Sequence, residues 1–145
     1  MELGPHHLGR FSGLSARRRW LALVAMLLLP LPARAARNAF SLRAMQLRDE
    51  AVRAGDQPYG AVVVKNGRIV GEAPSRVVTA GDPTAHAEME AIRDAARKLG
   101  TRDLSGCDLY GSSPACRMCE AAAYWAGVAR LFHGEEASGG RPPKL

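Results

Sequence analysis

The order of apolar and polar residues predicts a helix followed by a β-hairpin. Between residues 39 and 54, apolar residues recur every three to four positions, which is the spacing of an amphipathic helix, and the stretch closes at Gly55. Two short runs rich in β-branched residues, 60–65 and 68–72, are joined by Asn66-Gly67, a dipeptide typical of a tight hairpin turn. We therefore expect a helix and then two antiparallel strands.

The following segments alternate between helix and strand. Asp82-Pro83-Thr84 offers a capping residue and a proline suited to a first helical turn, and the helix that it predicts ends at Gly100. Residues 107–110 alternate like a strand, residues 116–126 are alanine-rich and helical, and residues 128–132 form another strand. This order predicts an α/β fold in which one sheet carries helices on its faces.

The first 35 residues have the layout of a signal peptide. The basic cluster Arg17-Arg18-Arg19 precedes an apolar run at 21–29 and the small-residue pattern Ala33-Arg34-Ala35. The apolar run is about half the length that spans a bilayer, and the paired arginines resemble the twin-arginine type of signal. We therefore expect a periplasmic or secreted protein that meets the membrane only during export.

This layout divides the chain into a signal peptide at 1–35, one domain at 36–133 and a flexible tail at 134–145 that is rich in glycine and proline. A start of translation further along the chain, at Met26 or Met45, would instead leave the protein in the cytoplasm. A chain of 145 residues has room for one domain of ordinary size.

The positive charge lies mostly in the first segment. Five of the 20 basic residues and one of the 14 acidic residues precede position 36, so the net charge falls from +6 for the whole chain to +2 for 15 basic and 13 acidic residues. The domain itself therefore shows no strong basic patch, and its composition gives little support for a nucleic-acid partner.

Candidate metal ligands occur at the start of two predicted helices. His86, Cys116 and Cys119 supply one imidazole and two thiolates, the number of ligands that a catalytic zinc uses when its fourth position is left to water. Cys116 and Cys119 are three residues apart, so a helix presents them on one face, and its N-terminus favours thiolates. If Cys107 or His133 also reached the metal, the site would be closed and structural instead. The favoured interpretation of Cys107 is a buried, inert thiol.

Glu88 is the candidate proton carrier. It lies two residues after His86, so the two side chains share one side only if one of them sits in the irregular first turn of the helix. There Glu88 would lie near the metal without binding it and would act as general base and then general acid.

Three segments together resemble the cytidine and deoxycytidylate deaminase superfamily, and within it the bacterial guanine deaminases and the transfer-RNA adenosine deaminases. These segments are residues 82–93 around His86-Ala87-Glu88, residues 58–64, and residues 118–127. The resemblance implies a zinc-dependent hydrolase that removes the amino group of a nucleobase or nucleoside. It also implies a three-layer α/β/α sandwich with a mixed five-stranded sheet, a homodimer, and substrate contacts at Ser75 and Ala87.

The chain departs from that family pattern at several positions. Relatives usually carry asparagine at the position of Ser75 and proline at the positions of Ala115 and Arg117. They also continue after Phe132 into another strand and one or two helices, so we expect a fold shortened at its C-terminal end. Guanine deamination is the favoured function, and adenosine deamination in transfer RNA is the alternative. A zinc-bound fold without catalysis, serving stability or association, is the second alternative.

Overall fold

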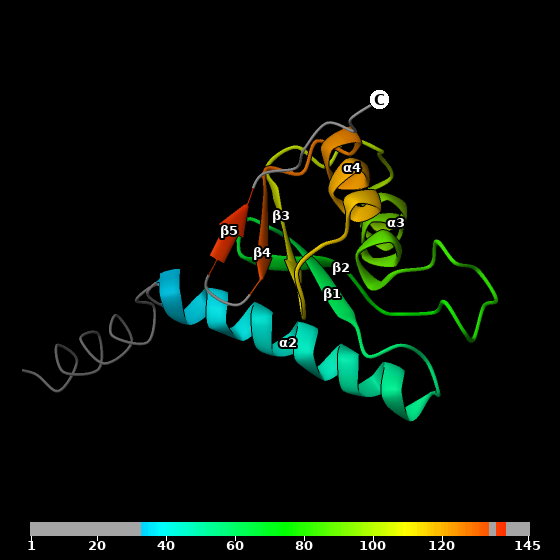
Figure 1. Cartoon of the computed structure of the whole chain (residues 1–145). Helices are drawn as coiled ribbons and strands as arrows, with labels where there is room; N and C mark the ends of the chain where they lie inside the picture. The colour runs from blue at the N-terminus through cyan, green and yellow to red at the C-terminus, as the bar shows by residue number, and fades with distance from the viewer. Residues whose placement is uncertain (1–32, 134–135, 139–145) are drawn as a thin grey trace, which may run out of the picture. The chain divides into compact units, whose positions relative to one another are not determined.

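The computed structural model describes residues 33–133 and 136–138 (Figure 1). Their helices and strands follow in the order α2 (Ala33–Arg53), β1 (Gly60–Lys65), β2 (Arg68–Pro74), α3 (Ala87–Leu99), β3 (Cys107–Gly111), α4 (Arg117–Trp125), β4 (Arg130–His133) and β5 (Glu136–Ser138). Among these residues, no helix combines the length and the apolar character needed to cross a bilayer.

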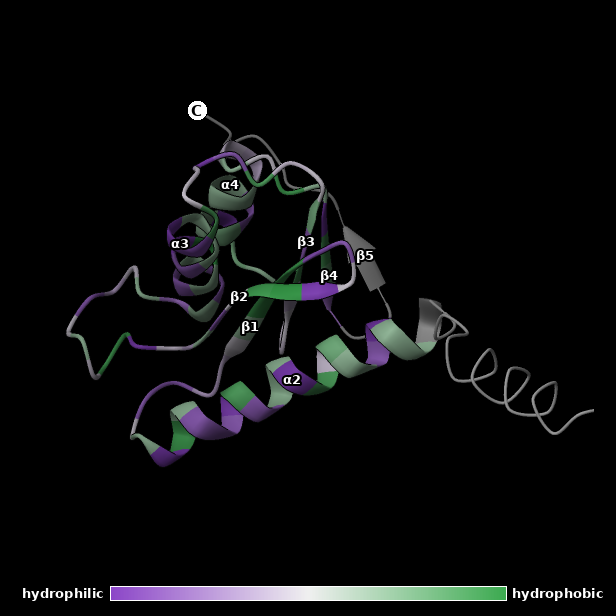
Figure 2. Ribbon diagram, turned by 180° about the vertical axis from the view of Figure 1, so that it is seen from behind, coloured by the Kyte–Doolittle hydropathy of each residue, from purple (hydrophilic) through white to green (hydrophobic). Residues whose placement is uncertain are grey.

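One mixed sheet of five strands, in the order β2-β1-β3-β4-β5, forms the middle layer. β1 pairs antiparallel with β2 and with β3, β3 and β4 run parallel, and β5 pairs antiparallel with β4. α2 covers one face of the sheet, and α3 and α4 lie on the other face (Figures 1 and 2). The expected α/β/α sandwich with a mixed sheet is confirmed.

Alternate residues of β1 belong to the two halves of the core, which explains why the strand carries no polar side chain from Gly60 to Val64. Val62 and Val64 pack in the cluster that includes Leu47 of α2, whereas Ala61 and Val63 pack in the cluster that includes residues of α3 and α4. A central strand buried on both faces has no solvent-facing positions for polar residues. From Gly60 to Val64 the sequence of β1 is therefore a continuous apolar run and does not alternate between apolar and polar residues.

The hairpin turn follows the sequence prediction closely. Asn66 and Gly67 adopt φ angles of 51° and 73°, and the tight type I′ turn requires positive φ at both central positions. Asparagine and glycine tolerate this region best because a short polar side chain, or none, avoids the steric clash.

Three element starts differ from the prediction. α2 begins at Ala33, six residues before the predicted start at 39. α3 begins at Ala87 and not near Asp82, because the Asp82 carboxylate accepts hydrogen bonds from the backbone N–H and the hydroxyl of Thr84, both at 2.7 Å, and closes a turn before the helix. β4 begins at Arg130, two residues after the predicted start at 128. The helix that carries Glu88 therefore starts directly after His86, one of the candidate metal ligands.

The prediction of an unstructured tail and of a missing further strand is wrong for Glu136–Ser138, which form β5. The register pairs Leu131 with Ser138 and His133 with Glu136. β5 is the fifth strand of the sheet and pairs with β4 at its edge. The rest of the predicted tail lies outside the described residues.

The predicted signal peptide lies almost wholly outside the described residues. The small-residue pattern Ala33-Arg34-Ala35 forms the first turn of α2. Export therefore stays a prediction.

Two glycines allow helices to pack directly on the sheet. A Cβ atom at Gly71 of β2 would lie 2.5 Å from the backbone nitrogen of Ala95 and 2.6 Å from the carbonyl oxygen of Ala91, both in α3. A Cβ atom at Gly60 of β1 would lie 2.3 Å from the carbonyl oxygen of Ala44 in α2. Both helix backbones therefore rest against strand positions that only glycine fits.

We expect Gly71→Ala to lower the free energy of unfolding by about 3 kcal/mol, the upper end of typical overpacking costs, because the obstructing atoms are backbone and cannot rotate away. Gly100→Ala is a useful comparison, because a Cβ atom there meets nothing within 4 Å and only the positive φ of 66° is strained, at a cost of roughly 1 kcal/mol. Urea unfolding of the two variants measures the difference. Equal stabilities for Gly71→Ala and the wild-type protein would contradict the close packing.

Candidate metal and active site

Three potential ligand atoms meet at the N-terminal ends of α3 and α4. His86 is the N-cap residue of α3, Cys116 is the N-cap residue of α4, and Cys119 lies in the first turn of α4. The His86 Nδ1 atom lies 3.6 Å from Cys116 Sγ and 3.7 Å from Cys119 Sγ, and the two sulfur atoms are 3.6 Å apart. The structure thus brings all three predicted ligands together.

These separations fit a tetrahedral zinc ion. Zinc–sulfur bonds of about 2.3 Å and zinc–nitrogen bonds of about 2.0–2.1 Å place the ligand atoms of a tetrahedron roughly 3.5–3.8 Å apart. The observed separations of 3.6, 3.6 and 3.7 Å fall within that interval. Among the side chains that the structure describes, neither Cys107 nor His133 joins the group. The donor set therefore leaves a fourth position open, as a catalytic zinc site requires.

The backbone at the helix starts explains how His86 and Glu88 reach the same space. His86 has an extended conformation, with φ −61° and ψ 151°, and the helix begins one residue later. Cys116 is extended in the same way, with φ −75° and ψ 169°. Because the cap residue is not yet helical, the spacing of two between His86 and Glu88 does not force their side chains apart.

The glutamate lies next to the ligands and is almost fully enclosed. Glu88 is 6% exposed, and the thiol of Cys119 donates to its Oε2 atom at 3.6 Å. Burial raises the pKa of Glu88 above its ordinary value, although hydrogen bonds oppose the shift. The structure therefore places a buried carboxyl group at the edge of the ligand group.

The pKa of the Cys119 thiol differs from the prediction. Burial raises the pKa of Cys119 far above its ordinary value, and the neighbouring Glu88 carboxylate and Cys116 add to the shift. The expected stabilisation of a thiolate at the helix N-terminus is outweighed for Cys119, because a buried charge without a cation is costly. Zinc binding must therefore displace a proton from this residue.

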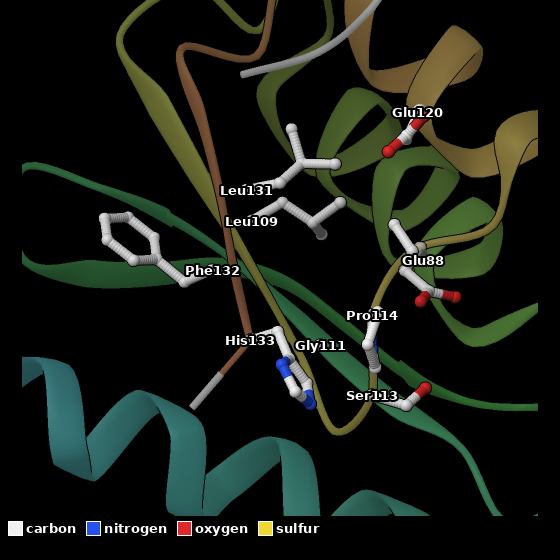
Figure 3. A pocket seen from close by; sticks show the side chains of 10 residues that line it. Glu88, Leu109, Gly111, Ser113, Pro114, Glu120, Leu131, Phe132 and His133 are labelled. Atoms are coloured by element: carbon white, nitrogen blue, oxygen red, sulfur yellow. The ribbon is translucent and has the colours of Figure 1, made fainter. Parts of the chain in front are cut away.

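Two cavities border Glu88. The larger, about 530 Å³, is lined by Gln57, Tyr59, His86, Glu88, Ser113, Pro114 and Cys116. The smaller, about 140 Å³, lies between the helices and strands β3 and β4, and its walls include Glu88, Glu120 and Leu131 (Figure 3). The larger cavity is lined by two of the three metal ligands and by Glu88. A substrate bound in this cavity would therefore lie next to the metal and to the glutamate.

Comparison with known proteins agrees with this geometry. Residues 35–135 match the family model described as the cytidine and deoxycytidylate deaminase zinc-binding region. The chain belongs to this deaminase family. Its metal ligands and the fit of their spacing to zinc make zinc the cofactor of the site.

Two named kinds of deaminase are similar to this chain. The guanine deaminase of Bacillus subtilis strain 168 is 47% identical over 100 residues, which cover 68% of this chain and 64% of the relative. The X-ray structure of a Bacillus subtilis guanine deaminase has a TM-score of 0.64 and 46% identity, covering 66% of this chain and 62% of that one. A transfer-RNA-specific adenosine deaminase of Aquifex aeolicus is 45% identical over 76 residues, which cover 52% of this chain and 50% of the relative. The chain therefore spans about half to two thirds of the lengths of these relatives.

The two substrate contacts that the family resemblance implies, Ser75 and Ala87, lie away from the cavities. Ser75 is 2% exposed, and its hydroxyl donates to Asp56 Oδ1 at 2.8 Å, so it is not on the wall of either cavity. Ala87 is fully buried and packs in the core between the sheet and α3. The structure therefore brings neither side chain to the site.

Sequence reasoning missed the residues that form the remaining wall of this deaminase site. Gln57 and Tyr59 precede β1, and Ser113 and Pro114 follow β3, so both pairs lie in loops at the same edge of the sheet. The polar residues directly after Gly55 were the available signal for the first pair. A loop residue that follows no periodic pattern gives no indication of which cavity it lines.

Asp56 organises the loops next to the site. Its carboxylate accepts hydrogen bonds from Ser75 Oγ, from the backbone N–H groups of Gln57, Val78 and Thr79, and from the Thr79 hydroxyl. Burial alone would raise the pKa of Asp56, but these hydrogen bonds outweigh it and hold the pKa well below the usual range. One carboxylate therefore ties the loop before β1 to the loop before α3.

Proposed function

We propose that this chain catalyses the hydrolytic removal of an amino group from a nucleobase, with guanine as the preferred substrate. The observation that carries the proposal is the presence of Glu88 on the wall of the same open cavity as the metal ligands His86 and Cys116. The reaction consumes water and guanine and releases xanthine and ammonia.

The residues of the site divide the chemistry among themselves. His86, Cys116 and Cys119 would hold zinc, which supplies Lewis acidity at its fourth position. Glu88 would accept a proton from the attacking water and deliver it to the ring nitrogen as the bond from the ring carbon to oxygen forms. It would then carry the second proton from that oxygen to the amine as the bond from carbon to nitrogen breaks, which leaves a carbonyl group and releases ammonia. Tyr59 offers an aromatic ring on the cavity wall against which a planar base can pack.

The composition of the cavity wall favours a free base over a transfer RNA. Of the described residues that line the larger cavity, none is lysine or arginine. Recognition of a nucleic acid rests largely on cationic contacts to phosphates. The similarity to the Bacillus subtilis guanine deaminase supports the same choice.

Adenosine deamination in transfer RNA is the second candidate. It is supported by the Aquifex relative and by a solved structure from a study of A-to-I editing by tRNA:A34 deaminases. That structure has 36% identity and a TM-score of 0.65, covering 66% of this chain and 70% of that one. A zinc-bound fold without catalysis is the third candidate function. It is motivated by Ser75 and Ala115, which depart from the family pattern. The homodimer that the family resemblance implies stays a prediction.

An ammonia-release assay of the zinc-loaded protein separates these candidates. The substrates are guanine, adenine and cytosine, their nucleosides, and a transfer RNA with adenosine at the wobble position. We expect the highest kcat/KM for guanine. Turnover of the transfer RNA alone would establish the second candidate. The absence of ammonia from every substrate, with zinc bound in full, would favour the fold without catalysis.

A further inference from the structure

The backbone of Gln57 is held on both sides by hydrogen bonds. Its N–H donates to Asp56 Oδ1 at 2.8 Å, and its carbonyl oxygen accepts from the backbone N–H of Tyr59, also at 2.8 Å. Asp56 is in turn fixed by the loop before α3 through Ser75, Val78 and Thr79. The position from which the Gln57 side chain projects is therefore well defined.

The side chain of Gln57 is uncommitted within the protein. It is half-buried and lines the larger cavity beside His86, Glu88 and Cys116. Among residues 35–133, its side-chain amide makes no hydrogen bond to another residue. A terminal amide has two donor hydrogens and an acceptor oxygen. A polar group with this capacity on the wall of a ligand cavity is suited to a ligand that offers a donor beside an acceptor.

Ser75 cannot take this role, because its hydroxyl is already used. The buried hydroxyl donates to the same Asp56 carboxylate that fixes the backbone of Gln57. Asp56 thus removes the serine from contact with a ligand and positions the glutamine. The amide expected at position 75 from the family resemblance is present instead at position 57, in the preceding loop.

We infer that Gln57 determines substrate specificity by binding the lactam edge of an oxopurine, where a ring N–H lies beside a carbonyl group. Its Nε2 donates to the carbonyl oxygen and its Oε1 accepts from the ring N–H. The inference rests on the proposed function and deepens it, because it assigns the choice between oxopurines and other aminated rings to one side chain.

The test compares guanine with 2-aminopurine, which keeps the reacting amine but lacks the lactam edge. In the wild-type protein we expect a higher kcat/KM for guanine. In Gln57→Leu, which keeps a similar volume without hydrogen-bonding atoms, this preference should fall by about tenfold or more, as expected for lost hydrogen bonds. The loss should appear mainly in the KM for guanine, with kcat little changed. Gln57→Glu, which removes the donor, should lose the preference as well.

Gln46→Leu is the matched control, because Gln46 is exposed on α2 and lies on neither cavity wall. It should keep the wild-type preference. Calorimetric titration with 8-azaguanine in the Glu88→Gln background provides a readout without turnover, since this guanine analogue keeps the reacting amine. In that background Gln57→Leu should weaken binding about tenfold.

The outcomes separate the inference from the proposed function. An unchanged preference and unchanged 8-azaguanine binding in Gln57→Leu would overturn the inference while leaving the proposed function intact. A wild-type protein without turnover that still binds 8-azaguanine through Gln57 would contradict the function and support the inference. A wild-type protein that neither turns over guanine nor binds the analogue would overturn both.

Discussion

Replacing Glu88 by glutamine is expected to lower the turnover number by about 10³-fold, which lies within the range of general acid–base catalysis and corresponds to about 4 kcal/mol in activation free energy. Glutamine keeps the size of the side chain but cannot carry a proton between water and the leaving amine. Glu88 is 6% exposed and borders the open cavity beside the metal ligands. Because the carboxyl group is not a member of the ligand group, zinc content should be unchanged.

Steady-state ammonia release and metal analysis of the same preparation measure the two effects separately. Glu90→Gln is the matched control, since Glu90 lies on the same helix, pairs with Arg93 and lines neither cavity. It should retain wild-type turnover. Residual activity of Glu88→Gln within about tenfold of the wild-type value would remove Glu88 from the proton-carrying role, since such a role usually contributes at least 10²-fold.

The parts of the fold that sequence could predict are those governed by neighbouring residues. Asn66-Gly67 specifies its turn through local backbone preferences, and the structure has both residues at positive φ. Cys116 and Cys119 are three residues apart on one helix, so their common direction also follows from local geometry. Spacing alone does not place His86, because its position beside the cysteines depends on packing between two helices.

The errors arose where tertiary contacts compete with local signals. Asp82 looked like a helix cap, but its carboxylate closes a turn with Thr84 and the helix starts five residues later. The family resemblance implies a substrate contact at Ser75, but in the structure the Ser75 hydroxyl donates a hydrogen bond to Asp56, nineteen positions away. No local pattern shows which of two loops will supply a buried carboxylate to the other, and the role of Gln57 was missed for the same reason.

Removing the Cys119 thiol is expected to weaken zinc binding by about 10²-fold or more. Loss of a residue that only supports a metal ligand typically costs 10–100-fold, and loss of a ligand itself should cost at least as much. Cys119 is fully buried, and its Sγ atom lies 3.6 Å from Cys116 Sγ and 3.6 Å from Glu88 Oε2, so alanine removes one of the three ligand atoms from the interior of the site. Cys119→Ala should therefore be purified with little zinc and should release no ammonia.

Thermal unfolding shows this loss without any assay of activity. Zinc at about 100 times its Kd stabilises the folded state by about 2.7 kcal/mol, which raises the Tm of a domain of this size by roughly 10–20 °C. Cys119→Ala should lose this shift, whereas Cys107→Ala should keep it, because Cys107 is buried in β3 and outside the ligand group.

The same zinc-dependent shift should depend on pH in a defined direction. Burial raises the pKa of the Cys119 thiol, so protons and zinc compete for the same sulfur atom, and lowering the pH favours the protonated form. The gain in Tm on adding zinc should therefore shrink as the pH falls and grow as it rises. A gain that is independent of pH, or one that survives in Cys119→Ala, would mean that zinc stabilises the fold from another position and that the three-ligand site is not its binding place.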